Sequence, residues 1–212
     1  SNHAKSGFVG SAYTLQDESG QSVQKLACEV PVEVVHYGVK NVSPANIDLK
    51  LKHDFNFLTV AQMGPRKNLA PMIKWFAEEF HNDEVGFVVK ANIANNSGID
   101  RVKLRNSIES VLKPFGDNRK CKVHLVHGNM SDDEVHALYT DPKVKAYVTA
   151  THGEGFGLPI FEAAYSGLPV VAPDWSGHVD FLYAPVVNAK SKKTTIKPLF
   201  EKVAFDIKPV PK

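Results

Sequence analysis

The sequence lacks the features that mark nucleic-acid-binding and membrane-spanning proteins. Its 25 basic and 23 acidic residues give a formal net charge of only +2, and no basic run is interleaved with aromatic residues. We therefore expect no nucleic-acid partner. No stretch approaches the roughly 18 apolar residues that cross a bilayer, and the first residues do not have the order of a signal peptide. We expect no transmembrane segment, and any bound anion has to be held by local groups.

Cysteine is also scarce. Cys28 and Cys121 are the only two cysteines, and they match no metal-ligand spacing. Such a pair is typical of free thiols in a reducing compartment, with a disulfide between them as the alternative. We accordingly expect a cytoplasmic protein.

Short apolar runs that alternate with segments of helical period make up most of the sequence. This alternation is typical of βαβ units around a parallel sheet and predicts an α/β, doubly wound fold. The runs expected to form strands span residues 55–61, 85–91, 122–127, 145–150 and 168–173.

Three helices are expected between these strands. The first carries an apolar stripe at i, i+3 and i+4 spacing, with Asn68 placed to cap it. A second helix is expected over residues 100–112. The third begins with Ser131 and Glu134 at capping-box spacing, so the acidic "DDE" at 132–134 is expected to favour the helix N-terminus rather than to hold a metal. The stripe of the first helix consists of Leu69, Met72, Ile73, Phe76, Ala77 and Phe80.

The two ends of the chain differ from its middle. Residues 1–31 are mostly small and polar, and residues 32–41 are a candidate strand followed by a glycine turn. The tail after residue 186 is rich in lysine and proline and is expected to be irregular.

A glycine-rich stretch, "THGEGFGLPIFE" (residues 151–162), follows the expected strand at 145–150. The next helix is expected to begin near Leu158 or Pro159. The free N–H groups and the partial positive charge of a helix N-terminus at this position favour phosphate. Gly155 and Gly157 allow the backbone to approach such a ligand closely, so the stretch predicts an anion or nucleotide site.

One interpretation of this stretch is a dinucleotide-binding site. Gly153, Gly155 and Gly157 approximate the fingerprint of an NAD-type oxidoreductase domain, and Asp174 stands where a ribose-binding acid is expected. However, the third glycine of that fingerprint should fall at position 158, which is Leu158, and the motif should lie on an early strand of its unit, whereas four strands precede it here.

The other reading uses two glutamates, because Glu154 and Glu162 are eight residues apart and both can face one ligand at the helix N-terminus. The stretch "HGEGFGLPIFEAAYSGLPVVAPDWSG" resembles the E-x7-E signature of retaining GT-B glycosyltransferases, family 4. The segments "FLTVAQMGPRKNLAPMIKWF" and "VHLVHGNMSDDEVHALYTDPKVKAYVTATH" also resemble this family, so that the resemblance covers roughly residues 55–182.

The resemblance implies a Rossmann-like domain that binds a nucleotide sugar, the C-terminal half of a GT-B fold. Lys67 matches the family's diphosphate-binding lysine, Glu162 its ribose-binding glutamate, and Glu154 the glutamate that faces the donor sugar and is the catalytic candidate. The residues expected to line the ligand through the loop and near the nucleobase are Gly155, Phe156, Gly157, Leu158, Asn129 and Met130. No D-x-D carboxylate pair is present to hold a metal, and we expect no cofactor other than the nucleoside-diphosphate sugar itself.

One departure from the family concerns the diphosphate. The position that usually carries an arginine, five residues before Lys67, is Gln62. A neutral amide donor typically contributes less than a charged one, about 0.5–1.5 against 1.5–3 kcal/mol. Arg66 is a candidate substitute, although adjacent side chains in an extended loop are expected to diverge.

The length is the second departure, because GT-B enzymes have two Rossmann-like domains. We expect residues 1–45 to be the end of an N-terminal domain with its link, 46–185 to be the nucleotide-sugar-binding domain, and 186–212 to be a tail packed on it. An acceptor glycan, lipid or other hydroxyl compound would then bind through the absent domain. The expected function is donor binding for a hexosyltransferase with little or no turnover by this chain alone, with a non-catalytic binding relative as a further alternative.

Overall fold

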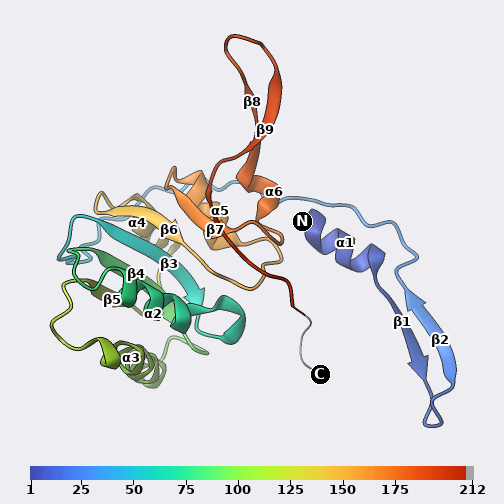
Figure 1. Ribbon diagram of the computed structural model, residues 1–212, viewed down its shortest axis with the longest axis horizontal. Coiled ribbons are helices and arrows are strands. Elements are labelled where there is room, and N and C mark those ends of the chain that lie inside the picture. Colours follow the sequence, from blue (N-terminus) through green and yellow to red (C-terminus); the bar gives the residue numbers. More distant parts are fainter. Residues whose placement is uncertain (209–212) are drawn as a thin grey trace.

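A six-stranded parallel sheet forms the centre of the computed structural model, which describes residues 1–208 (Figure 1). The strand order is β10-β7-β6-β3-β4-β5. The chain runs outward from β3 to β5 and then returns to the other side of β3, so the topological switch point lies between β3 and β6. Ligands of doubly wound folds bind at such a point, beyond the carboxyl ends of the strands. The strands are β3 (Asn56–Gln62), β4 (Gly86–Asn92), β5 (Lys122–Val126), β6 (Val144–Val148), β7 (Val170–Pro173) and β10 (Glu201–Val203).

The five strands expected from the sequence are confirmed, and so is the α/β, Rossmann-like fold class. Helices cover both faces of the sheet, since the side chains of each strand alternate between two cores. Phe87 and Val89 pack with α2 and α3, whereas Leu58 and Val88 pack with α4 and α5. The helices that follow the central strands are α2 (Leu69–Glu79), α3 (Gly98–Leu112), α4 (Asp132–Thr140), α5 (Leu158–Tyr165) and α6 (Val179–Leu182), with short 3-10 turns η1 (Pro65–Lys67) and η2 (Lys113–Phe115).

Two of the expected helix starts can be compared directly with the structure. At α4, Ser131 and Glu134 form the predicted capping box, with both reciprocal hydrogen bonds present. At α2, Asn68 occupies the N-cap position, but the expected side-chain cap was wrong. Asn68 has a left-handed backbone (φ 54°), and its amide donates to the carbonyl oxygen of Ala150 instead (3.1 Å). This bond ties the start of α2 to the chain just after β6.

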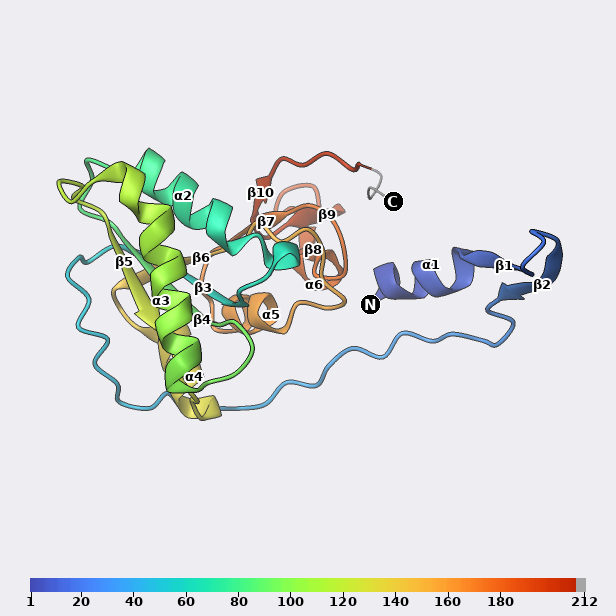
Figure 2. The same ribbon diagram turned by 90° about the horizontal axis from the view of Figure 1, so that it is seen from below.

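The first part of the chain projects away from the sheet. Helix α1 (Asn2–Gly10) and the antiparallel hairpin of β1 (Ala12–Gln16) and β2 (Ser22–Ala27) form an arm beside the central body (Figures 1 and 2). Residues 28–55 contain no helix or strand, so the expected strand within 32–41 was wrong. This segment runs along the body as an extended link, where the backbone N–H of Ala45 donates to the carbonyl oxygen of Asp133 (3.0 Å).

The tail is more regular than its composition predicts. β8 (Tyr183–Val187) and β9 (Thr194–Pro198) form an antiparallel hairpin that projects from the body, and β10 adds to the edge of the sheet beside β7 (Figure 1). The expectation of an irregular tail was therefore wrong for residues 186–203, whereas residues 204–208 belong to no helix or strand and residues 209–212 lie outside the described part. Backbone pairing between strands orders this tail, although its side chains show no strand-like alternation of apolar and polar residues.

Within residues 1–208, no helix is long and apolar enough to span a membrane.

Candidate functional site

Two loops meet at the carboxyl edge of the sheet, next to the switch point. One follows β3 and contains η1, and the other follows β6 and contains the glycine-rich stretch. The backbone N–H of His152 donates to the carbonyl oxygen of Arg66 (2.8 Å), and the hydroxyl of Thr151 donates to the same oxygen (3.2 Å). These bonds fix the loops against each other, so side chains far apart in the sequence converge.

Glu154 is the centre of this convergence. Its side chain is only 8% exposed, and its two carboxylate oxygens accept from two cations. The ammonium group of Lys67 lies 2.5 Å from Oε1, and Nη1 of Arg66 lies 3.1 Å from Oε2. Burial raises the pKa of Glu154, but the hydrogen bond and charge of Lys67 and the bond from Arg66 outweigh burial, so that the net pKa lies below its ordinary value. Glu154 is thus an ionised, nearly buried carboxylate at neutral pH.

Arg66 and Lys67 do not diverge as the sequence reasoning expected. The 3-10 turn η1 brings both side chains to the same carboxylate, and Arg66 also donates to the carbonyl oxygen of Gly153 (2.6 Å). Arg66 is more than half exposed, whereas Lys67 is mostly covered. Lys67 therefore presents its charge inside the site, while Arg66 braces the glycine-rich loop from its solvent side.

The glycine-rich loop is shaped by backbone constraints at its end. Gly157 has φ 90°, and a Cβ there would lie 3.1 Å from Cβ of His178 and 3.2 Å from Cδ1 of Ile160. Only glycine adopts this geometry without strain. Helix α5 begins at Leu158, as predicted, with Pro159 in its first turn and no side-chain cap on its N–H groups. An uncapped N-terminus at the end of such a loop is suited to an anion.

A second loop supports the first from behind. The hydroxyl of Ser176 donates to the carbonyl oxygen of Glu154 (2.7 Å) and accepts from its backbone N–H (2.8 Å). The N–H of Gly177 donates to the same carbonyl (2.9 Å), and a Cβ on Gly177 would lie 2.0 Å from the carbonyl oxygen of Gly155. Neither Ser176 nor Gly177 was expected from the sequence to have a role in the site. The one signal in the sequence for this close backbone approach is that a glycine, Gly177, directly follows Ser176 in "DWSG".

Phe156 differs from the other loop residues. Its ring is nearly buried among Tyr37, Phe161 and Phe181, with ring centroids 4.9, 5.4 and 4.9 Å away. Phe156 therefore anchors the loop through its side chain, and only its backbone remains for a ligand. Leu158 lines a different cavity, which Glu162 also lines.

A cavity of about 350 Å³ opens beside Lys67, between the ends of β3, β4 and β5. Gln62, Asn129 and Met130 line it as well, so the structure brings together four residues that the sequence singled out. The side-chain amide of Gln62 already donates to the carbonyl oxygen of Ile93 (2.7 Å). Lys90 also lines this cavity, although the sequence indicated for it only a place in the strand at 85–91.

Glu162 lies in a neighbouring cavity of about 280 Å³, which shares Val135 with the first. Residues 37–40 and 42 of the link form one wall of this second cavity. Burial raises the pKa of Glu162, and the hydroxyl of Tyr139, which donates to Oε2 (2.9 Å), offsets only part of that rise. The two glutamates of the E-x7-E stretch thus have opposite pKa shifts, because only Glu154 has cations beside it.

A buried carboxylate, Asp100, holds the rim of the first cavity through hydrogen bonds. Asp100 accepts from the backbone N–H groups of Ile93 and Ala94 (3.0 and 2.9 Å) and from Nε2 of His127 (2.9 Å). Burial acts against the charge of Asp100, but these bonds hold its pKa well below the usual range. The loops that follow β4 and β5 are therefore fixed to each other through α3, a role that the sequence reasoning missed.

Asp174, the ribose-binding acid expected under the NAD-type alternative, is hydrogen-bonded to other residues of the chain. Asp174 accepts hydrogen bonds from the hydroxyl of Tyr183 (2.8 Å) and from Nζ of Lys202 (2.6 Å). Its carboxylate is therefore part of the contact between β7, β8 and β10. In the part of the chain that the structure describes, no three His, Cys, Asp or Glu side chains lie close enough together to hold a metal ion.

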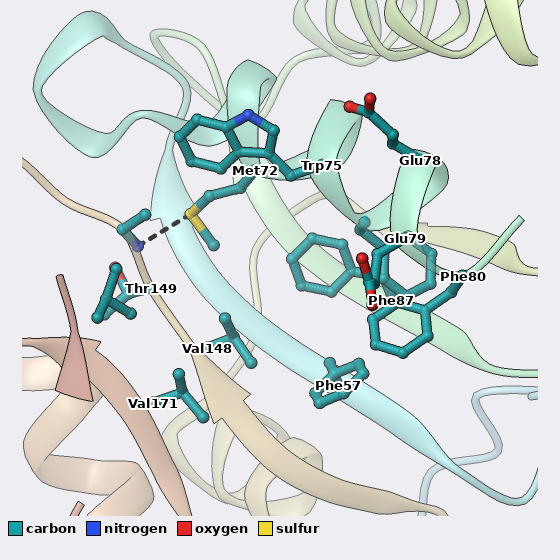
Figure 3. Close-up of a pocket in the computed structure, with 13 residues that line it drawn as sticks. Phe57, Met72, Trp75, Glu78, Glu79, Phe80, Phe87, Val148, Thr149 and Val171 are labelled. Carbon is teal, nitrogen blue, oxygen red and sulfur yellow. Dashed lines mark hydrogen bonds between the residues drawn. The ribbon is translucent and has the colours of Figure 1, made fainter. Parts of the chain in front are cut away.

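A further cavity of about 490 Å³, with a largely apolar lining, does not belong to the site. It lies between α2 and the sheet, on the face opposite α5, and is lined mainly by aromatic and aliphatic side chains (Figure 3). Its charged lining residues, Glu78 and Glu79, are acidic and would repel a phosphate. The Lys67 cavity is therefore the better candidate for an anionic ligand.

Comparison with known proteins gives a family and several relatives. Residues 46–188 match the family model described as glycosyl transferases group 1. A sucrose synthase from Denitrovibrio acetiphilus is 30% identical over 129 residues, which is 56% of this chain and 16% of the relative. The chain thus spans about a sixth of the length of the curated relative that it matches.

Solved structures with similar folds are more distant in sequence. The C-terminal domain of a glycosyl transferase group 1 family protein from Francisella tularensis is 18% identical, with a TM-score of 0.47 over 67% of this chain and 72% of that one. A UDP-forming trehalose-phosphate synthase from Burkholderia xenovorans is 13% identical, with a TM-score of 0.48 over 62% of this chain and 32% of that one. Because the family model covers most of the chain, the protein belongs to the glycosyl transferases group 1 family.

Proposed function

We propose that this chain binds the nucleoside-diphosphate sugar donor of a glycosyltransferase that transfers a hexose with retention of configuration. The observation that carries the proposal is the convergence of Lys67, Glu154 and the start of α5 at one edge of the sheet, beside a cavity of about 350 Å³. In a nucleotide sugar, the diphosphate can bind a cation and free backbone N–H groups, and the hydroxyl groups can donate to a carboxylate.

The diphosphate is assigned to Lys67 and to the backbone of Gly155, Phe156, Gly157 and Leu158. Transfer breaks the bond between the anomeric carbon and a diphosphate oxygen and forms a bond to an acceptor hydroxyl oxygen, whose proton passes to the departing diphosphate. Negative charge grows on the departing diphosphate, where a positioned ammonium group and a helix N-terminus stabilise it. Since the protein supplies this positive charge, we propose that donor binding needs neither a metal ion nor another cofactor.

Glu154 is assigned to the donor sugar, as the catalytic residue of this chain. An ionised carboxylate accepts hydrogen bonds from sugar hydroxyl groups, and bonds to an ionised acceptor are roughly twice as strong as neutral ones. Its carboxylate is also close enough to Lys67 to hold that side chain in place before the ligand arrives. Glu154 therefore couples the sugar to the residue that binds the diphosphate.

The nucleoside is assigned to the two cavities that share Val135. Glu162 accepts from the ribose hydroxyls, and the backbone near Asn129 and Met130 meets the base. Gln62 is occupied with the loop carbonyl of Ile93, so we give it a structural role at the rim and assign the diphosphate charge to Lys67. The acceptor, a glycan, lipid or other hydroxyl compound, is proposed to enter from the side of the donor sugar.

Calorimetric titration of the chain with UDP, GDP, ADP and NAD in the presence of a chelator tests this function. We expect at least one nucleoside diphosphate to bind without metal, and NAD to bind more weakly. Binding of NAD alone would favour the oxidoreductase alternative. If no ligand of the four binds, the chain is a relative without donor-binding function and the proposal fails.

A further inference from the structure

Lys90 is a charged residue in the middle of an otherwise buried strand. Its neighbours in β4, Val88, Val89 and Ala91, are at most 3% exposed. Lys90 is aligned with Val60 of β3 and Val126 of β5, and both valines pack on the core beneath α4 and α5. Laterally aligned residues of parallel strands point to the same face. The lysine therefore rises from the sheet between two apolar side chains, on the side of the candidate site.

The ammonium group of Lys90 has little to balance its charge. Nζ donates to the carbonyl oxygen of Gly128 (2.6 Å), which satisfies one of its three N–H groups. Among residues 1–208, no carboxylate forms an ion pair with it, and burial lowers its pKa. Placing a lysine at a half-buried position without an acidic partner is costly. A ligand that accepts hydrogen bonds from the remaining N–H groups would offset that cost.

The position of Lys90 shows which part of a nucleotide it would meet. Gly128 lies between the end of β5 and Asn129, at the opposite wall of the cavity from β3. Lys67 lines the same cavity but is held by Glu154 at the glycine-rich loop. The cavity therefore has one lysine at its proposed diphosphate end and another at its proposed nucleobase end.

We propose that Lys90 selects the nucleobase by donating a hydrogen bond to a ring carbonyl oxygen, so that the site takes uridine or guanosine diphosphate sugars in preference to adenosine ones. This inference rests on the proposed function. Guanine has an oxygen acceptor at O6, and uracil has one at O4 as thymine does, whereas adenine has an amino donor at the equivalent position. The ammonium group of Lys90 can donate to O6 of guanine or O4 of uracil, whereas it faces another hydrogen-bond donor in the amino group of adenine. Sites that are built to bond a particular polar group discriminate strongly against ligands that lack it.

The test compares UDP, GDP and ADP by calorimetry on the wild-type chain and on Lys90→Met, with exposed Lys103→Met of α3 as the matched control. The wild type should bind UDP or GDP about tenfold or more tightly than ADP, as one good base contact would give. Lys90→Met should remove most of that preference, while ADP affinity stays within about threefold and Lys103→Met behaves as the wild type.

Other outcomes separate the possible failures. Equal affinity of the wild type for all three nucleotides overturns the role of Lys90 before any variant is made. Equal weakening of all three in Lys90→Met, together with weaker binding of inorganic pyrophosphate, overturns it in favour of a phosphate contact. If Lys90→Met does not fold, Lys90→Gln retains a donor without charge and should keep part of the preference. A wild type that binds none of the nucleotides contradicts the proposed function itself.

Discussion

The ammonium group of Lys67 lies 2.5 Å from Oε1 of Glu154, so a carboxylate neutralises the lysine to which we assign the diphosphate. The pair is mostly covered, with 16% of the Lys67 side chain and 8% of the Glu154 side chain exposed. A bound diphosphate would gain the attraction of Lys67 and meet the repulsion of Glu154 at the same time. A donor sugar that lies between the diphosphate and Glu154 resolves this conflict, because its hydroxyl groups donate to the carboxylate.

Glu154→Gln tests this balance. The substitution removes a negative charge beside the proposed diphosphate, and we expect UDP to bind about threefold to tenfold more tightly, from an electrostatic change on the order of 1 kcal/mol. UDP-glucose should gain less, since the sugar loses an ionised acceptor. Calorimetry with UDP and UDP-glucose measures the change in affinity for each ligand. Glu78→Gln, at an exposed position, serves as the control because it removes the same charge. Weaker UDP binding in Glu154→Gln would contradict the proposed arrangement of charges.

Gly157 offers a test of the loop geometry. Gly157→Ala places a Cβ at φ 90° within 3.2 Å of two side-chain atoms, and we expect a loss of roughly 1–3 kcal/mol in the free energy of unfolding. Gly155→Ala is the matched control, because a Cβ there meets no atom within 4 Å. Urea denaturation of both variants provides the comparison. Equal stabilities would mean that the left-handed turn before α5 is not required.

The raised pKa of Glu162 predicts a pH dependence for nucleoside binding. Burial favours the protonated carboxyl, in which one oxygen carries a proton and donates, whereas the ionised form offers both oxygens as acceptors to the two ribose hydroxyls. As pH falls, the group takes up its proton above the ordinary glutamate pKa of about 4.3, so affinity should weaken earlier than for an exposed glutamate. Uridine is the suitable probe because it carries no titrating phosphate. A pH-independent affinity for uridine, or the same profile in Glu162→Gln, would return Glu162 to a purely structural role.

Much of the central fold could be predicted from the sequence because its elements are coded locally. The buried strands are continuous apolar runs, and the apolar stripe of α2 and the capping box of α4 are spaced by the helical repeat. The hairpin of β8 and β9 and the edge strand β10 are not coded in this way. Their residues are mostly exposed, so they lack the alternation that marks a half-buried strand.

The candidate site was predictable where backbone requirements leave a mark. Glycines at a strand-to-helix junction indicated the loop, and the spacing of Glu154 and Glu162, through its resemblance to the E-x7-E signature, led to the ligand class that we propose. Contacts between distant segments left no such mark. The convergence of Arg66 on Glu154, the support from Ser176, and the position of Lys90 beside Gly128 all depend on the register of neighbouring strands and loops. Lys90 carried one usable signal, a charge inside an apolar strand.

The most direct test of the central claim is the response of UDP and uridine binding to Lys67→Ala. Both ligands would be titrated calorimetrically into the wild type and the variant at low salt with a chelator. Loss of a charged hydrogen bond of about 1.5–3 kcal/mol predicts that UDP binds roughly tenfold to a hundredfold more weakly. Uridine should keep its affinity, since it makes no contact with Lys67. An equal loss for both ligands, or unchanged UDP binding, would contradict a diphosphate site at Lys67.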